Sequence, residues 1–279
     1  MDRIKIITDS TADLPRHIVE KNDIEVLPLL VNINGKSYRD GIDINLRSLL
    51  DLMELSDEFP TTSQVNPETF LESYKRYLYE GYKVISIHIS SKMSGACQSA
   101  KIAKETLGSE DIHIIDSQNV TSGLGLLVLK ACRLRDEGKS AAEINRAVME
   151  IRPHVKSALV FDSLENLVRG GRLPKAVGKV GNMLGIKLIM EVGDGEMKLL
   201  DKVRGSKRAV KYVTKYVDRL GIKSGETSVL LHVESNETLP ALRGNLKEAN
   251  VDFFECEVGC VVGVHAGPGA CGVFFIENF

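Results

Sequence analysis

Three separated stretches of the chain carry side chains that could bind a small anion. They are residues 60–64 (Pro-Thr-Thr-Ser-Gln), 90–95 (Ser-Ser-Lys-Met-Ser-Gly) and 265–269 (His-Ala-Gly-Pro-Gly). A carboxylate or phosphate needs hydrogen-bond donors, and hydroxyls, imidazole and backbone N–H groups supply them without adding a fixed countercharge. If the three stretches meet in space, we expect them to bind an anionic head group.

Each candidate also has a purely structural interpretation. Ser94 and Gly95 stand between a predicted strand and a predicted helix, where exposed N–H groups bind anions, but Ser94 could be an ordinary N-cap. Thr61, Thr62 and Ser63 offer more hydroxyls than one cap requires, although such hydroxyls also bond to local backbone. His265, at a predicted strand end, is by base rate more often structural than functional.

Residues 267–272 match the pattern G-x-G-x-x-G in a context that argues against a dinucleotide site. That fingerprint requires a helix to follow inside a βαβ unit, whereas a strand is predicted here. The chain also contains no G-x-x-x-x-G-K-[ST] loop, so we expect no P-loop for ATP. We expect these glycines to allow the backbone to turn tightly beside a ligand.

Cysteine and histidine give little support to a metal site. The five cysteines are Cys97, Cys132, Cys256, Cys260 and Cys271, with no C-x-x-C pair. We expect them to be free, buried thiols in a reducing compartment. The six histidines are scattered, without H-x-H or H-E-x-x-H spacing. The sequence therefore predicts neither a metal nor a cofactor.

Composition and charge narrow the class of protein. The 279 residues include 36 Lys and Arg against 38 Asp and Glu, a formal net charge of −2, which argues against general nucleic-acid binding. No apolar run approaches the roughly 20 residues that cross a bilayer. The first residues enter a strand-like run without a signal-peptide pattern. We expect a cytoplasmic protein without an integral membrane segment.

Strands and helices alternate through the first half of the chain. This alternation predicts βαβ units and a mostly parallel sheet. Asn34-Gly35 is a strong hairpin signal, Asn66-Pro67 a helix start, and residues 140–143 a capping box. Strands are expected at 5–8, 25–32, 84–89 and 112–115, and helices at 45–54, 66–80, 94–107, 124–137 and 140–152.

The pattern changes near Pro153, where we place a domain boundary. We expect an α/β protein with an N-terminal, mostly parallel domain (1–153) and a C-terminal α+β domain (154–279) with a mostly antiparallel sheet. Strands are predicted at 158–161, 186–192, 197–203, 227–233, 252–257, 261–265 and 272–276. Helices are predicted at 164–169, 174–184, 207–220 and 239–249. Two basic turns, 169–172 and 202–208, are either solvated surface or the rim of a docking site.

Taken in order, these motifs resemble the DegV family, the fatty-acid-binding proteins of bacteria. The matching stretches are 8–15, 61–64, 90–95 with 98–100, 170–172, 185–187, 202–209 and 265–269. They extend over essentially the whole chain, and the ordered set is far more specific than any one motif. This sequence departs from the usual residues of the family at Ala96-Cys97 and at Ala266. Both departures affect the width of the pocket beside the head group.

The resemblance implies a long-chain fatty acid bound in a tunnel between two domains. It also implies a carrier without a catalytic centre of its own, which presents the carboxylate to the catalytic subunit of a fatty acid kinase for conversion to acyl phosphate. Transient contact with a membrane surface fits that role. By motif, Thr62 and Ser94 contact the carboxylate, with His265 and Arg172 in the surrounding polar network. Arg204 and its basic neighbours are the expected kinase-docking face.

Two other classes of function remain open from the sequence. The first is an esterase acting on a lipid ester, with Ser94 as nucleophile and His265 as base. Against it, residues 92–96 do not match G-x-S-x-G, and no carboxylate is evidently placed to orient the histidine. The second is a lipid-sensing regulator, which requires the basic turns to bind nucleic acid.

Overall fold

The computed structural model describes residues 2–174, 185–235 and 237–279. Four parallel strands form one sheet in the order β2-β1-β6-β7. They are β1 (Ile4–Asp9), β2 (Ile24–Leu27), β6 (Lys83–His88) and β7 (Ile112–Asp116). The central strands β1 and β6 are buried almost throughout, as a parallel sheet covered on both faces requires.

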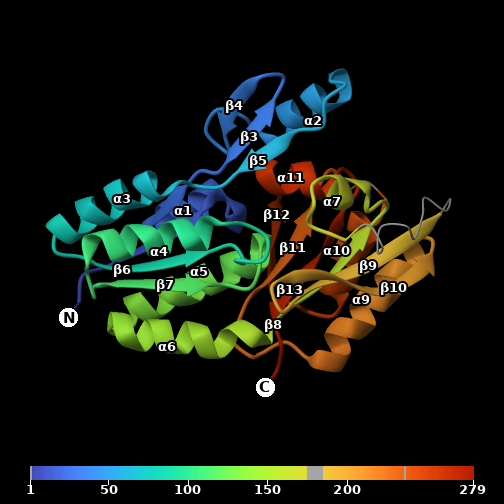
Figure 1. The fold of residues 1–279 in the computed structure, drawn as a ribbon. Coiled ribbons are helices and arrows are strands. Elements are labelled where there is room, and N and C mark those ends of the chain that lie inside the picture. Colours follow the sequence, from blue (N-terminus) through green and yellow to red (C-terminus); the bar gives the residue numbers. More distant parts are fainter. Residues whose placement is uncertain (1, 175–184, 236) are drawn as a thin grey trace.

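Helices cover both faces of this sheet. Figure 1 shows α3 and α4 on one face and α5 and α6 on the other. Their bounds are Pro67–Tyr79 (α3), Ala96–Leu107 (α4), Thr121–Asp136 (α5) and Ala141–Ile151 (α6); the turn η1 (Ser10–Ala12) and α1 (Arg16–Lys21) connect β1 to β2. The predicted Asn66 cap and the capping box that begins at Ser140 are confirmed.

A second sheet of six strands has the order β10-β9-β8-β13-β11-β12. Every neighbouring pair is antiparallel except β11 with β12. The strands are β8 (Val155–Phe161), β9 (Ile186–Gly193), β10 (Glu196–Arg204), β11 (Ser228–His232), β12 (Phe253–Glu257) and β13 (Cys271–Ile276). Helices α9 (Ser206–Leu220) and α10 (Leu239–Glu248) bury their apolar faces against one side of it. Its other side faces the large core shared with the parallel sheet.

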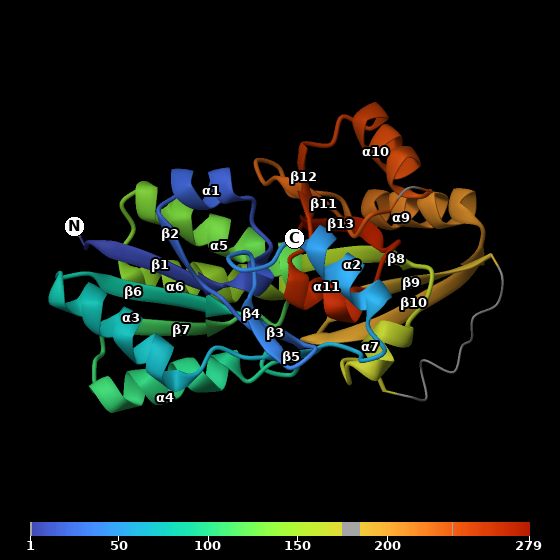
Figure 2. The same cartoon turned by 90° about the horizontal axis from the view of Figure 1, so that it is seen from above.

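A small three-stranded sheet, β4-β3-β5, lies over the junction of the two larger sheets (Figures 1 and 2). Its strands are β3 (Leu30–Ile33), β4 (Lys36–Arg39) and β5 (Thr61–Ser63), with α2 (Leu46–Leu55) between the last two. The predicted turn at Asn34-Gly35 is confirmed: both residues have positive φ, 51° and 70°, as a two-residue hairpin of this type requires.

The predicted strand at 261–265 is wrong, because these residues belong to helix α11 (Cys260–Ala266). Three valines in this segment favour a strand, but distant side chains satisfy the first N–H groups of a helix. The Gly259 N–H donates to Asp13 Oδ1 (2.9 Å), and the Cys260 N–H donates to Asp40 Oδ1 (2.7 Å). Tertiary hydrogen bonds thus override the local preference.

The mixed α/β class, with a parallel N-terminal sheet and a mostly antiparallel C-terminal sheet, is as predicted. The change from one sheet to the other falls at the short turn η2 (Arg152–His154), between α6 and β8. The division into domains 1–153 and 154–279 remains our proposal. The helix predicted at 174–184 lies almost wholly on residues outside the described part of the chain.

Candidate functional site

A cavity lies where the three sheets meet. The empty space between its lining atoms, including the open solvent at its mouth, is about 980 Å³. Most of the lining is apolar and comes from elements far apart in the sequence. Examples are Ile89 after β6, Leu159 and Phe161 of β8, Met197 of β10, Leu231 of β11 and Val261 of α11. Such a lining suits a flexible hydrocarbon chain.

Polar groups in the lining include Thr62, Ser94, Gly95, Arg172 and His265. The structure therefore brings together five of the seven residues singled out from the sequence. The other two, Thr61 and Ser63, are exposed and do not line the cavity. Side chains alternate along β5, so only the middle hydroxyl faces inward, and the Ser63 hydroxyl accepts a hydrogen bond from Asn32 (2.9 Å).

His265, in the last turn of α11, is linked to Thr62 across the cavity wall. Its Nε2 lies 2.9 Å from Thr62 Oγ1, whereas its Nδ1 is buried with no hydrogen-bond partner among the described residues. Gly170 makes room for the ring, because a Cβ at that position would lie 2.0 Å from Nδ1. Burial, with a smaller contribution from the positive charge of Arg172, lowers the pKa of His265 to about 4. The imidazole is therefore neutral near pH 7.

Arg172 is a half-buried cation that no carboxylate in the described part of the chain neutralises. Its Nε donates to the Met93 carbonyl (3.2 Å) and its Nη1 to the Gly170 carbonyl (2.6 Å). Within the described part of the chain it forms no ion pair with a carboxylate. Burial lowers its pKa, which shows that the charged form is poorly compensated here. An anion in the cavity would supply the missing charge.

Ser94 precedes the N-cap of α4, which is Gly95, so the serine is not the N-cap that the structural interpretation assumed. The Ser94 hydroxyl accepts a weak bond from the Ala96 N–H (3.3 Å), which leaves its own hydrogen available to a ligand. Gln64 lies against Gly95, where a Cβ would come within 2.0 Å of Gln64 Oε1. Its amide donates to the Ser99 hydroxyl (2.9 Å).

The lining also contains polar residues that the sequence did not single out, namely Thr11, Gln64, Thr121 and His232. Gln64 stood within a quoted motif, and Thr11 within the polar turn after the first strand. Neither residue type nor spacing marked them as cavity residues. Arg204, by contrast, is exposed at the end of β10 and does not line the cavity.

The arrangement required by an esterase is not formed among the described residues. His265 Nε2 bonds to Thr62 rather than to Ser94, and no carboxylate in the described part of the chain contacts Nδ1.

All five cysteines are free and buried. The described residues contain no group of three His, Cys, Asp or Glu side chains suited to a metal ion. Within the same part of the chain, no helix combines the length and the apolar character that a bilayer crossing demands.

The neutral His265 makes a prediction about stability. An unfolded chain binds a proton at this histidine near pH 6.5, whereas the folded protein binds it only near pH 4. Below pH 6.5 the unfolded state therefore holds more protons, and the free energy of unfolding falls as the pH decreases toward 4. The full effect is on the order of 3 kcal/mol.

Urea denaturation of the lipid-free protein and of His265→Gln, at a series of pH values, measures this effect. The stability of the wild type should fall relative to that of the variant as the pH decreases. Asp13 and Asp40, whose pKa values are raised by burial, titrate in both proteins and cancel in the difference. Parallel curves across this range would contradict the prediction.

The fold and the cavity together define a class of mixed α/β proteins. Their two main sheets enclose a mostly apolar pocket, and one wall of that pocket carries hydroxyl, imidazole and guanidinium groups. The chain belongs to the DegV family. The model for that family, described as "Uncharacterised protein, DegV family", matches residues 3–278. A DegV domain-containing protein of Clostridium acetobutylicum is 58% identical over 279 residues, which cover all of both chains.

Solved structures show the same fold. A DegV family protein from Thermus thermophilus, described for its fatty acid binding, superposes with a TM-score of 0.92 at 30% identity over 99% of this chain and all of that one. The B3 protein of the Streptococcus pneumoniae fatty acid kinase, solved with linoleic acid, gives a TM-score of 0.85 at 23% identity, again over 99% and 100%.

Proposed function

We propose that the protein binds a long-chain fatty acid in this cavity and presents its carboxylate to a partner kinase. The observation that carries the proposal is the Arg172 guanidinium, which pairs with no carboxylate in the described part of the chain, in the wall of a mostly apolar cavity beside His265, Thr62 and Ser94. The Thermus thermophilus relative, with its fatty acid binding, supports the class of ligand.

Estimated binding energies favour different roles for the hydrocarbon tail and the carboxylate head of the fatty acid. Each buried methylene contributes about 0.8 kcal/mol, so a chain of about 16 carbons offers on the order of 10 kcal/mol before the costs of association. A buried, unpaired carboxylate would cancel several kcal/mol of this gain. The wall donors and the Arg172 charge offset that loss. The tail therefore supplies the affinity, and the polar wall sets the orientation of the acid.

Mass spectrometry of lipids extracted from natively purified protein tests the class of ligand. We expect stoichiometric long-chain fatty acid. Protein that emerges without lipid and fails to bind added fatty acid would overturn the proposal.

The hydroxyls matter more for phosphoryl transfer than for retention of the lipid. Ser and Thr donors orient a carboxylate without adding a second positive charge beside that of Arg172, and so leave it more nucleophilic toward a phosphoryl donor than a second cation would. We expect Ser94→Ala and Thr62→Ala to lower acyl phosphate formation by a fatty acid kinase subunit at least tenfold, and lipid affinity less than threefold. Kinase assays on lipid-loaded protein, beside equilibrium binding, measure the two effects. An equal loss of both would contradict this division of roles.

A further inference from the structure

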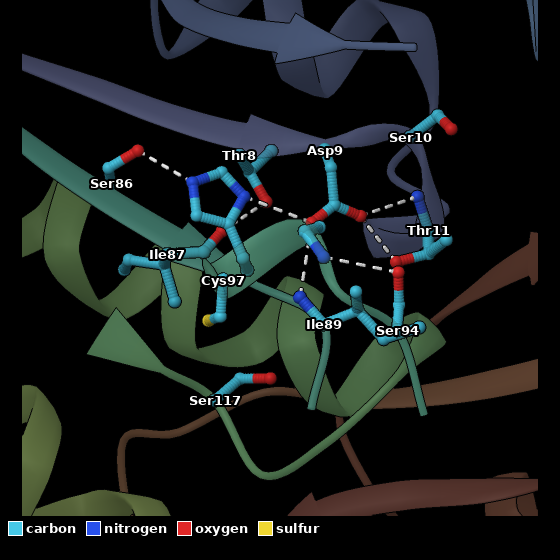
Figure 3. Close-up of polar contacts among 12 residues, drawn as sticks. Thr8, Asp9, Ser10, Thr11, Ser86, Ile87, Ile89, Ser94, Cys97 and Ser117 are labelled. Atoms are coloured by element: carbon cyan, nitrogen blue, oxygen red, sulfur yellow. Dashed lines mark hydrogen bonds and ion pairs between the residues drawn. The ribbon is translucent and has the colours of Figure 1, made fainter. Parts of the chain in front are cut away.

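Asp9, the last residue of β1, lies directly behind the cavity wall. Its side chain is fully buried and engages four hydrogen-bonding groups. Oδ1 accepts from the N–H (3.1 Å) and the hydroxyl (2.5 Å) of Thr11, and Oδ2 accepts from the Ile89 N–H (3.1 Å) and contacts His88 Nδ1 (3.0 Å). Figure 3 shows Asp9 between Thr11 and Ile89. Both of these residues line the cavity, so one carboxylate joins two separate segments of its wall.

The His88 ring is itself fixed by hydroxyl groups behind it. Its Nε2 lies 2.6 Å from Ser86 Oγ, which accepts a hydrogen bond from the Tyr74 hydroxyl (2.7 Å). Because Tyr74 uses its hydrogen on Ser86, the Ser86 hydrogen is directed at Nε2, and the ring hydrogen then lies on Nδ1, facing Asp9. The Phe70 ring packs edge-on against the imidazole, with the ring centres 4.8 Å apart.

Ser86, His88 and Asp9 repeat the order of groups in a serine hydrolase, yet they cannot attack a ligand. All three side chains are fully buried, and none lines the cavity. A chain of donors that ends on an inaccessible carboxylate serves to orient that carboxylate.

We propose that Asp9 is a positioning residue of the head-group site and that His88 holds its carboxylate in the required orientation. This inference rests on the function proposed above. Ile89 leads directly into residues 90–95, which carry Ser94, so a shift of the Ile89 backbone moves the Ser94 hydroxyl. Hydrogen bonds to a charged carboxylate are stronger than neutral ones, which suits an anchor that must fix two segments at once.

Variants of His88 test the inference without replacing Asp9 itself. His88→Asn places an amide N–H close to the position of Nδ1, whereas His88→Leu removes the donor. The measured quantity is the preference for palmitic acid over hexadecanol, two probes with the same tail. We expect His88→Leu to lower this preference about tenfold, as the loss of a bond to a charged group predicts, and His88→Asn to restore most of it.

Two further variants separate positioning from charge and from general destabilisation. Asp9→Asn removes the carboxylate charge behind the wall. If that charge only repelled the bound acid, affinity for the acid would rise in this variant. Because Asp9 positions the wall, we expect affinity for the acid to fall. Thr8→Val removes a buried hydrogen bond to the Ile87 carbonyl (2.8 Å) one residue away, without touching Asp9. We expect it to keep the acid preference.

Hydrogen exchange of the Thr11 and Ile89 amides in lipid-free protein gives a readout independent of ligand. His88→Leu should accelerate both, and His88→Asn should not. Equal acid preference and equal exchange in the two His88 variants would overturn the inference and leave the proposed function intact. A wild type that binds neither probe would overturn the proposed function, and with it the role assigned to Asp9.

Discussion

Ala270→Phe is expected to abolish lipid binding. Ala270 is buried in the cavity lining, where a phenyl ring would occupy space that the hydrocarbon tail needs. In the proposed function the tail supplies most of the affinity, so the loss of about four methylene contacts alone would cost about 3 kcal/mol, or more than 100-fold in the dissociation constant. Equilibrium binding of palmitic acid and lipid content after purification measure the effect.

Ala270→Ser is the matched control, because a hydroxyl adds little volume. It should retain bound lipid, while both variants keep the wild-type circular dichroism spectrum. If Ala270→Phe binds palmitic acid as tightly as the wild type does, the tail does not lie in this cavity.

Arg172→Gln is expected to lower affinity for the fatty acid about 30-fold, while affinity for the alcohol of the same length stays within threefold. The Arg172 guanidinium lines the cavity and has no carboxylate partner among the residues that the structure describes, so a bound carboxylate gains a charge-assisted interaction that an alcohol does not. Binding of both probes to the same protein preparation gives the two constants.

Arg172→Lys separates charge from geometry. It keeps the positive charge but loses the planar donors that reach the carbonyls of Met93 and Gly170, so we expect an intermediate affinity for the acid. Equal losses for acid and alcohol in Arg172→Gln would place Arg172 in the tail wall or in a purely structural role.

Most elements of the fold could be predicted from the sequence, because local signals there agree with the tertiary structure. The β9–β10 hairpin, the capping box at Ser140 and the alternation of strands and helices in the first half are examples. Helix α11 could not be predicted, because the groups that satisfy its first N–H donors stand on Asp13 and Asp40, more than two hundred positions earlier.

The candidate site was predicted in outline but not in detail. Three adjacent hydroxyls marked 61–63, yet only the phase of β5 decides that Thr62 faces inward. Thr11 and Gln64 line the cavity because of how β1, β5 and α4 pack against one another. No local sequence pattern encodes that packing. The buried set of Asp9, Ser86 and His88 forms only when β1 and β6 pair, so alternation along β6 alone gave no sign of it.

The position of β13 has a consequence for when the proposed lipid site can form. It comes latest in sequence of the six strands, yet it lies between β8 and β11 in the middle of their sheet. A nascent chain emerging from the ribosome therefore has a gap at the centre of that sheet until β13 has been synthesised. If the proposed lipid site needs the complete sheet, lipid can bind only after β13 has been synthesised, and a truncated product that lacks β13 should carry no lipid.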